Sequence, residues 1–236
     1  DYRLAYVDGS HLGGYSRESW RADGVMGLCM NLMRNRYLTL FMAEFDAERL
    51  RHADLFVSVA AGKPFSEAER AAIRQFVLDG GIFIVTVGYP DAGPSRALLA
   101  DLGFEIGDGT EARGTFPGPA PFGFFKSPFY DTGAHRHHVR FHAAWPVHAI
   151  REDAQPIAYG RDDVPAIMVR RLGHGKVMVV GDSAFAMNKN LEVESGQAFE
   201  GMRENPHFWR WMLTYLEDRE LWVPPDPDQP QGEGAP

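Results

Sequence analysis

The stretch from Lys176 to Asn190, KVMVVGDSAFAMNKN, decides how the rest of the chain is interpreted. Its lysine is followed by four consecutive apolar residues, a pattern typical of a strand that is buried on both faces. The pattern then changes to Gly181-Asp182-Ser183, small and polar residues of the kind that end a strand at solvent. In an open α/β sheet, ligands bind in the crevice beyond the carboxyl ends of the strands, so a site is expected here.

The composition is that of a globular protein and excludes two classes of partner. The 236 residues are 44% hydrophobic and 24% charged, which is enough for one large core. The net charge is −8 and no run of Lys or Arg occurs, whereas binding to a nucleic-acid backbone needs a basic surface. No apolar run approaches the roughly 20 residues that span a bilayer, so no transmembrane segment is predicted within these residues.

The cell location is not determined by the sequence. The chain starts at Asp1 rather than Met, so a membrane anchor outside these residues is compatible with it. Our hypothesis is an extracytoplasmic or membrane-associated protein that is held there by such a segment. The redox compartment stays open as well, because one cysteine excludes only an internal disulfide and a cysteine-based zinc site.

Strand-like and helix-like segments alternate through the first hundred residues. The apolar runs predict strands at 3–7, 38–43, 55–60 and 82–87, and the periodic segments predict helices at 18–34, 46–52, 67–79 and 95–102. Ser66 and Glu69 form a capping-box pattern at the start of the third helix. Cys29 lies in the apolar stripe of the first helix and is expected to be a packed core thiol. Alternation with short connections favours a parallel sheet covered by helices.

The later part of the chain differs in pattern. Residues 104–150 combine frequent Gly and Pro with many aromatic residues and predict an irregular packed insertion. Residues 165–171 and 176–181 flank a short Gly-containing turn and predict an antiparallel hairpin. We therefore predict a flavodoxin-like α/β three-layer sandwich in one domain, residues 1–223, followed by a Pro-rich, linker-like tail at 224–236.

Several short motifs follow one another along the chain. They are Asp8-x-Ser10-His11, Leu50-x-x-Ala53-Asp54-Leu55-Phe56-Val57, Phe65-Ser66-Glu67-Ala68-Glu69, Phe76-Val77-x-x-Gly80-Gly81, Gly175-Lys176-Val177, Gly181-Asp182-Ser183-x-Phe185 and Asn188. In this order they resemble the class I glutamine-amidotransferase-like superfamily, and the resemblance covers about residues 3–103 and 156–218. More narrowly, the chain is similar to non-catalytic members of that superfamily that are fused to bacterial membrane or transport-accessory proteins. It also resembles the related opening domain of an intraflagellar-transport subunit.

The catalytic residues of true amidotransferases are missing from this chain. Those enzymes carry a Gly-x-Cys-x-Gly elbow after a central strand and a later His-x-Glu. Here the strand at 82–87 runs into Gly88-Tyr89-Pro90-Asp91 without a cysteine, and no His-x-Glu lies near the last strand. The resemblance therefore implies a non-catalytic binding or scaffolding domain of a larger, membrane-associated bacterial protein. Its ligand is a small molecule, a glycan or a protein segment, and the sequence does not choose among them.

The polar loops that follow the strands carry the candidate site residues. Carboxyl ends of parallel strands share one edge of the sheet, so we expect these side chains to approach one another there. They are Asp8, Ser10, His11, Asp182, Ser183 and Asn188. Three interpretations stay open: loop-capping residues, a non-covalent ligand site, or a hydrolase.

In the hydrolase hypothesis, Ser10 or Ser183 is the nucleophile, His11 its base and Asp182 or Asp8 the orienting group. Ser183 lacks the Gly-x-Ser-x-Gly elbow that would expose it. A further hypothesis is a degenerate enzyme kept as a dimerisation surface, with the aromatic insertion buried against another copy.

A metal or a cofactor is not expected. Five histidines cluster in the insertion, but no cysteine and no carboxylate at familiar ligand spacing completes a tetrahedral set. These histidines are His135, His137, His138, His142 and His148. Residues 10–14 precede a helix and could hold an anion, but they lack the Gly-x-Gly-x-x-Gly spacing of a dinucleotide site.

Overall fold

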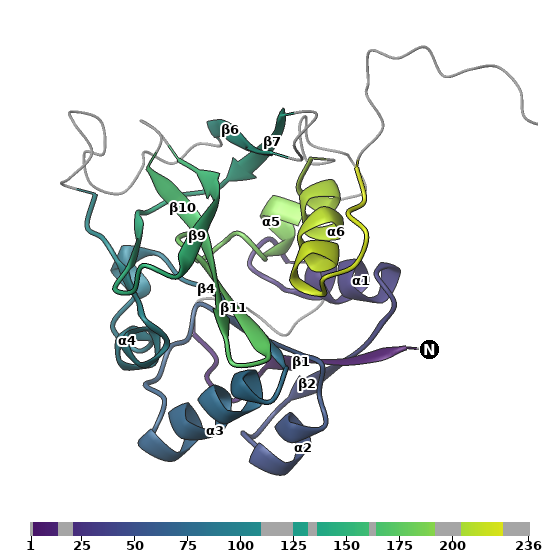
Figure 1. Ribbon diagram of the computed structural model, residues 1–236, viewed down its shortest axis with the longest axis vertical. Helices are drawn as coiled ribbons and strands as arrows, with labels where there is room; N and C mark the ends of the chain where they lie inside the picture. Colours follow the sequence, from purple (N-terminus) through teal and green to yellow (C-terminus); the bar gives the residue numbers. More distant parts are fainter. Residues whose placement is uncertain are drawn as a thin grey trace, which may run out of the picture.

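The computed structural model describes residues 2–13, 21–109, 125–131, 136–160, 164–191 and 204–223. Its centre is a seven-stranded sheet in the order β2-β1-β3-β4-β11-β10-β9 (Figure 1). The first five strands in this order are parallel to one another, and β10 runs antiparallel to both β11 and β9. The strands are β1 (Arg3–Asp8), β2 (Tyr37–Met42), β3 (Leu55–Val59), β4 (Ile82–Thr86), β9 (Ala154–Tyr159), β10 (Pro165–Leu172) and β11 (Gly175–Val180). The predicted mixed α/β fold, with a mostly parallel sheet and a late antiparallel hairpin, is confirmed.

The central strands are apolar because helices cover both faces of the sheet. Every residue of β3, β4 and β11 is buried, as expected for strands in a sheet covered on both faces. One face packs against α1 (Met26–Arg34), α5 (Asn188–Leu191) and α6 (Glu204–Leu216), and the other against α2 (Ala47–Arg51), α3 (Glu67–Leu78) and α4 (Arg96–Leu102). Figure 1 shows these two groups of helices on opposite sides of the strands.

The ends of α3 and α4 follow from local sequence. The Ser66 hydroxyl accepts a hydrogen bond from the Glu69 N–H, and the Glu69 carboxylate accepts one from the Ser66 N–H, so the predicted capping box is present. Gly103 ends α4 with φ of 89°, a left-handed conformation that costs glycine little.

The first helix is shorter than predicted. A helix was expected from about residue 18, whereas α1 begins at Met26; residues 14–20 lie outside the described part of the chain. The cause is distant in sequence: the Asn188 side chain accepts the Gly27 N–H at 2.7 Å and donates to the Arg21 carbonyl at 2.8 Å. Asn188 thus occupies backbone groups that a longer helix would have used itself.

The insertion is more regular than predicted. Within its described residues it holds β5 (Phe104–Ile106), β6 (Phe125–Asp131), β7 (Arg136–Phe141) and β8 (Val147–Ala149), which form the antiparallel pairs β5–β8 and β6–β7. The prediction of an irregular segment was therefore wrong for these residues. Their pattern is hard to recognise because β5 and β8 have three residues each and β7 mixes charged and aromatic residues. Residues 110–124, and the tail at 224–236, lie outside the described part.

Asn205 lies in the first turn of α6, which begins at Glu204. The Asn205 side chain accepts the Arg140 N–H and donates to the carbonyls of Arg140 and Asn190, which ties β7 to α5 and α6. Among the described helices, none has both the length and the apolarity to cross a membrane.

The buried thiol of Cys29 provides a direct test of this packing. Cys29 lies in the core between α1 and the sheet, and burial raises the pKa of its thiol to about 11. At pH 8 its thiolate fraction is then about a hundredfold smaller than that of an ordinary thiol. We expect the native chain to resist a disulfide reagent such as Ellman's reagent and to release one equivalent of thionitrobenzoate in guanidinium chloride. Rapid reaction of the native chain would contradict the packing of α1.

Candidate functional site

The structure places the predicted site residues at the carboxyl ends of the strands but in two separate groups. Asp8 ends β1, and Asp182 follows β11. Because β3 and β4 lie between these strands, the two groups are three strand spacings apart, about 14 Å. Ser10 and His11 belong to the first group, and Ser183 and Asn188 to the second.

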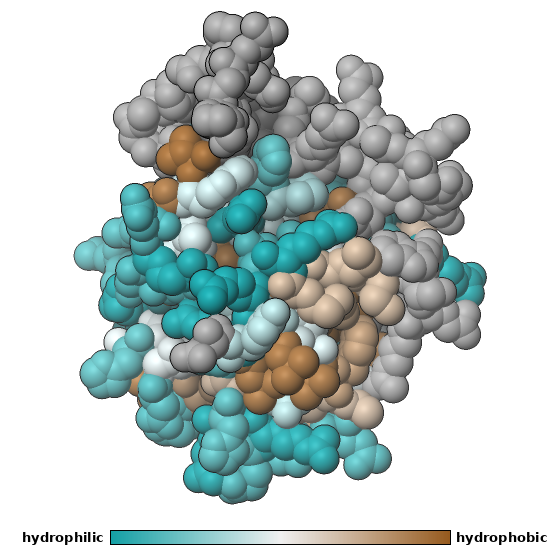
Figure 2. All heavy atoms as spheres, turned by 90° about the vertical axis from the view of Figure 1, so that its right-hand side faces the viewer, coloured by the Kyte–Doolittle hydropathy of each residue, from teal (hydrophilic) through white to brown (hydrophobic). Residues whose placement is uncertain are grey.

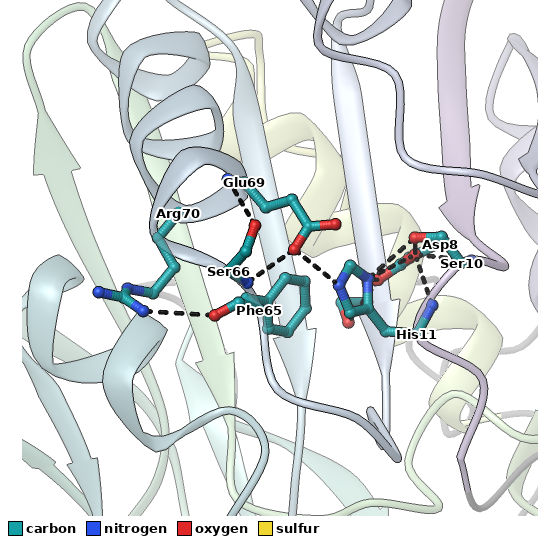
Figure 3. A network of polar contacts seen from close by, with 8 residues as sticks. Asp8, Ser10, His11, Phe65, Ser66, Glu69 and Arg70 are labelled. Atoms are coloured by element: carbon teal, nitrogen blue, oxygen red, sulfur yellow. Dashed lines mark hydrogen bonds and ion pairs between the residues drawn. The ribbon is translucent and has the colours of Figure 1, made fainter.

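The first group is arranged around the imidazole of His11, which is 1% exposed (Figure 3). Its Nδ1 lies 2.9 Å from both Asp8 Oδ2 and Ser10 Oγ. The Ser10 hydroxyl donates to Asp8 Oδ1 at 2.6 Å. On the opposite side of the ring, Nε2 faces Glu69 Oε2 at 3.5 Å, and the ring stacks on Phe65 with centroids 3.8 Å apart. The imidazole is therefore enclosed by a carboxylate at each end and an aromatic ring on one face.

This arrangement differs from a catalytic triad. A triad places a carboxylate at Nδ1 and a nucleophile at Nε2. Here Ser10 lies on the same side as Asp8, and within the described ranges no hydroxyl is within hydrogen-bond reach of Nε2. The group at Nε2 is Glu69, a carboxylate, so the geometry connects two chain segments rather than preparing a serine.

Glu69 and Phe65 are the residues that sequence reasoning missed at this site. Glu69 was recognised only as the acid of the capping box, yet the oxygen that accepts the Ser66 N–H also faces His11. Partial burial opposes ionisation of this carboxyl, but the hydrogen bonds with Ser66 and the charge of His11 outweigh it and lower the pKa of Glu69. The capping box thus connects the start of α3 to the loop after β1.

The crevice between β1 and β3 is filled by the protein itself. These strands flank the point where the strand order reverses, which is the usual ligand crevice of such sheets. The Gly62 N–H donates to the His11 carbonyl at 2.9 Å. A Cβ atom on Gly13 would lie 2.1 Å from the Ala60 carbonyl oxygen, so the two loops are in direct backbone contact.

The second group ties the insertion and the late loops to the sheet. Asp182 accepts backbone N–H groups from His142 and Ala143 through Oδ2 and from Ala184 through Oδ1. The Ser183 hydroxyl donates to Asp91 at 2.6 Å and accepts the Gly88 N–H at 2.7 Å. Asn188 binds α1, as described above. Each of these three side chains is engaged with another segment of the chain.

Burial of Asp182 has an electrostatic consequence. Desolvation raises its pKa to about 6, although the N–H donors and the Lys189 charge favour the carboxylate. Of the histidines, burial and the charges of Lys189 and Arg140 lower the pKa of His142. In the part of the chain that the structure describes, no three His, Cys, Asp or Glu side chains are grouped to hold a metal ion; His135 lies outside it.

The loop contact at Gly13 predicts intolerance of one added methyl group. We expect Gly13→Ala to lower the free energy of unfolding by about 1–3 kcal/mol, because the new Cβ would overlap backbone that cannot move easily. Gly93→Ala is the control, since no atom lies within 4 Å of its Cβ position, and it should be near neutral. Urea unfolding of both variants measures this, and equal effects would refute the closed crevice.

Asp182 predicts a pH dependence with a definite sign. Because its folded pKa is raised from 3.8 to about 6, the folded chain holds this proton more tightly than the unfolded chain. The stability of the wild type relative to Asp182→Asn should therefore fall by about 2 kcal/mol between about pH 4.5 and pH 7. Urea titrations at several pH values measure this gap. A gap that grows with pH would mean that the three N–H donors outweigh burial.

Comparisons with known proteins agree on the fold. No protein-family model matches the chain, and neither does any curated protein sequence. Among solved structures, it is similar to the IFT52 N-terminal domain, with a TM-score of 0.67 and 13% identity over 93% of this chain and 100% of that chain. This similarity agrees with the predicted relation to the opening domain of an intraflagellar-transport subunit.

Two further structures extend this comparison. A cytoplasmic protein from Salmonella typhimurium LT2 is similar with a TM-score of 0.57 and 12% identity over 91% of this chain and 98% of that chain. The β-galactosidase from Rahnella sp. R3 is similar with a TM-score of 0.52 and 17% identity; the match covers 92% of this chain but 32% of that chain. At these identities the similarity establishes the fold alone, a mixed α/β fold that occurs both as a whole chain and as about a third of a larger one.

Proposed function

We propose that this chain is a non-catalytic binding or scaffolding domain that works within a larger, membrane-associated bacterial protein. We further infer that it belongs to the flavodoxin-like class and to the glutamine-amidotransferase-like superfamily. The observation that carries the proposal is the enclosure of His11 between Asp8 and Glu69. A base that two carboxylates and a phenyl ring surround has no room to receive a substrate proton.

Two other observations support this proposal. The crevice at the reversal of strand order, where a small-molecule site would normally lie, is filled by the loops after β1 and β3. The fold also occurs as a segment of a larger chain, which is the arrangement expected of an accessory domain.

The face that we propose for binding lies at the carboxyl end of β4. A hollow of about 410 Å³ opens there, and its lining includes Tyr89, Arg96, Glu105 and Asp108. Tyr89 is 39% exposed and its ring lies 5.7 Å from the buried Trp145, so the core supports this ring from one side. An aromatic surface beside charges of both signs suits a protein segment or a glycan better than an apolar ligand.

The hydrolase hypothesis requires a reactive serine. It predicts that a fluorophosphonate probe labels Ser10 or Ser183 and that His11→Asn prevents the labelling. Our proposal predicts no labelling of the native chain, because both hydroxyls are held in hydrogen bonds with Asp8 and Asp91.

A photo-crosslinking experiment tests the binding role directly. Benzoylphenylalanine at Tyr89 should capture a partner in the host cell or in a reconstituted assembly. The same group at His174 should not. His174 is an exposed residue in the turn between β10 and β11, at the amino end of β11 and therefore at the opposite end of the strands. Mass spectrometry identifies the adduct. Capture at both positions alike, or serine labelling by the fluorophosphonate, would overturn the proposal.

A further inference from the structure

The two edges of the central sheet are built differently. The edge strand β9 contains Pro156, and its pairing with β10 has register shifts, two features that discourage a further strand from adding to an edge. The opposite edge strand, β2, has the sequence YLTLFM, with no proline and no charged residue. Natural proteins usually protect such an edge. Within the described residues no strand pairs with the outer side of β2.

The outer side of β2 presents three residues for hydrogen bonding. The Arg36 and Met42 carbonyls accept hydrogen bonds from Arg3 and Gly9, so even-numbered residues of this strand face β1. Backbone groups alternate in direction along a strand, and Tyr37, Thr39 and Phe41 therefore direct their N–H and C=O groups away from the sheet.

An apolar surface lies next to these backbone groups. Leu38 is 55% exposed and Leu40 is 42% exposed, and both side chains lie on the face that carries the short helix α2. Figure 2 looks onto the right-hand side of Figure 1 and shows hydrophobic side chains gathered between hydrophilic ones on this face. Exposed leucines beside an unprotected edge strand are typical of a surface that another strand covers.

The charges at the two ends of β2 select the kind of partner. At its amino end, Arg36 lines a hollow of about 700 Å³ together with Arg34 and Arg210. Just beyond its carboxyl end lies the exposed Glu44, for which the described part of the chain holds no ion pair. A strand that is basic at its start and acidic at its end is complementary to itself when the second copy runs antiparallel.

We propose that two copies of this chain associate through antiparallel pairing of their β2 strands. Thr39 lies opposite Thr39 of the second copy, and Tyr37 lies opposite Phe41, so all three outward-facing residues exchange hydrogen bonds. Leu38 then lies beside Leu40 of the second copy, and the four leucines form one apolar strip. The same register brings Arg36 of each copy toward Glu44 of the other. The two-fold axis closes the assembly at two copies.

The β2 edge and the hollow near Tyr89 are separate surfaces, so pairing at β2 does not require a ligand in the hollow. The crosslinking experiment at Tyr89 therefore fails or succeeds independently of it.

Sedimentation equilibrium of the whole chain tests the proposal. We expect a concentration-dependent mass that approaches twice 26.4 kDa. Leu38→Lys should raise the dimer dissociation constant by at least about tenfold, because it places two ammonium groups in the apolar strip. Ile150→Lys is the matched control, since Ile150 is also 55% exposed and lies just after β8, away from β2; it should leave the constant unchanged. Thermal unfolding shows that both variants are folded.

A charge exchange tests the register. Arg36→Glu should weaken the dimer, because it places glutamates near one another, and Glu44→Arg in the same chain should restore it. A wild-type chain that stays monomeric, a mass beyond the dimer, or equal effects of Leu38→Lys and Ile150→Lys would overturn the proposal. Failure of Glu44→Arg to restore a dimer weakened by Arg36→Glu would overturn the register.

Discussion

A buried polar side chain must find its hydrogen-bond partners inside the protein, and this constraint governs the carboxyl end of the sheet. Among the described residues, the polar side chains buried at or near that end include Asp8, His11, Asp182, Asn188, Asn190 and Asn205. Their partners come from other segments of the chain, so each side chain joins two or more elements. Removal of one partner leaves the other unsatisfied, at a cost of about 1–3 kcal/mol. The polar residues that suggested a site in the sequence are therefore the residues that hold the loops together.

The same constraint separates what the sequence could predict from what it could not. The apolar runs of β3, β4 and β11 and the capping box at Ser66 are local patterns, and the structure contains each of them. The start of α1 was missed because Asn188, 161 residues away, binds its first turn. The helix propensity of residues 18–34 carries no information about such a contact, and tertiary contacts can override this propensity.

The candidate residues lie at the carboxyl ends of the strands, as predicted, but in two groups that do not meet. Convergence of Asp8 and Asp182 was expected because both follow parallel strands, yet the order of strands places β3 and β4 between them. That order depends on long-range pairing, which the spacing of motifs does not encode. The position of Glu69 beside His11 has the same origin, because the capping box accounts for only one of its two contacts.

The carboxyl ends of the strands and the β2 edge would place two copies of the chain differently in an assembly. In the proposed dimer the two β2 strands run in opposite directions, so the two seven-stranded sheets become continuous while their carboxyl ends point in opposite directions. The two hollows beside Tyr89 then lie at opposite ends of the joined sheet, too far apart to act on one small ligand. Such a dimer suits a scaffold, because each copy can hold a partner without interfering with the other. Catalysis by residues shared between the copies would instead need the carboxyl ends of the strands of both copies to meet at one interface. The β2 edge, which no described strand covers, and the contact between the loops after β1 and β3 therefore favour the same proposed role, that of connecting partners.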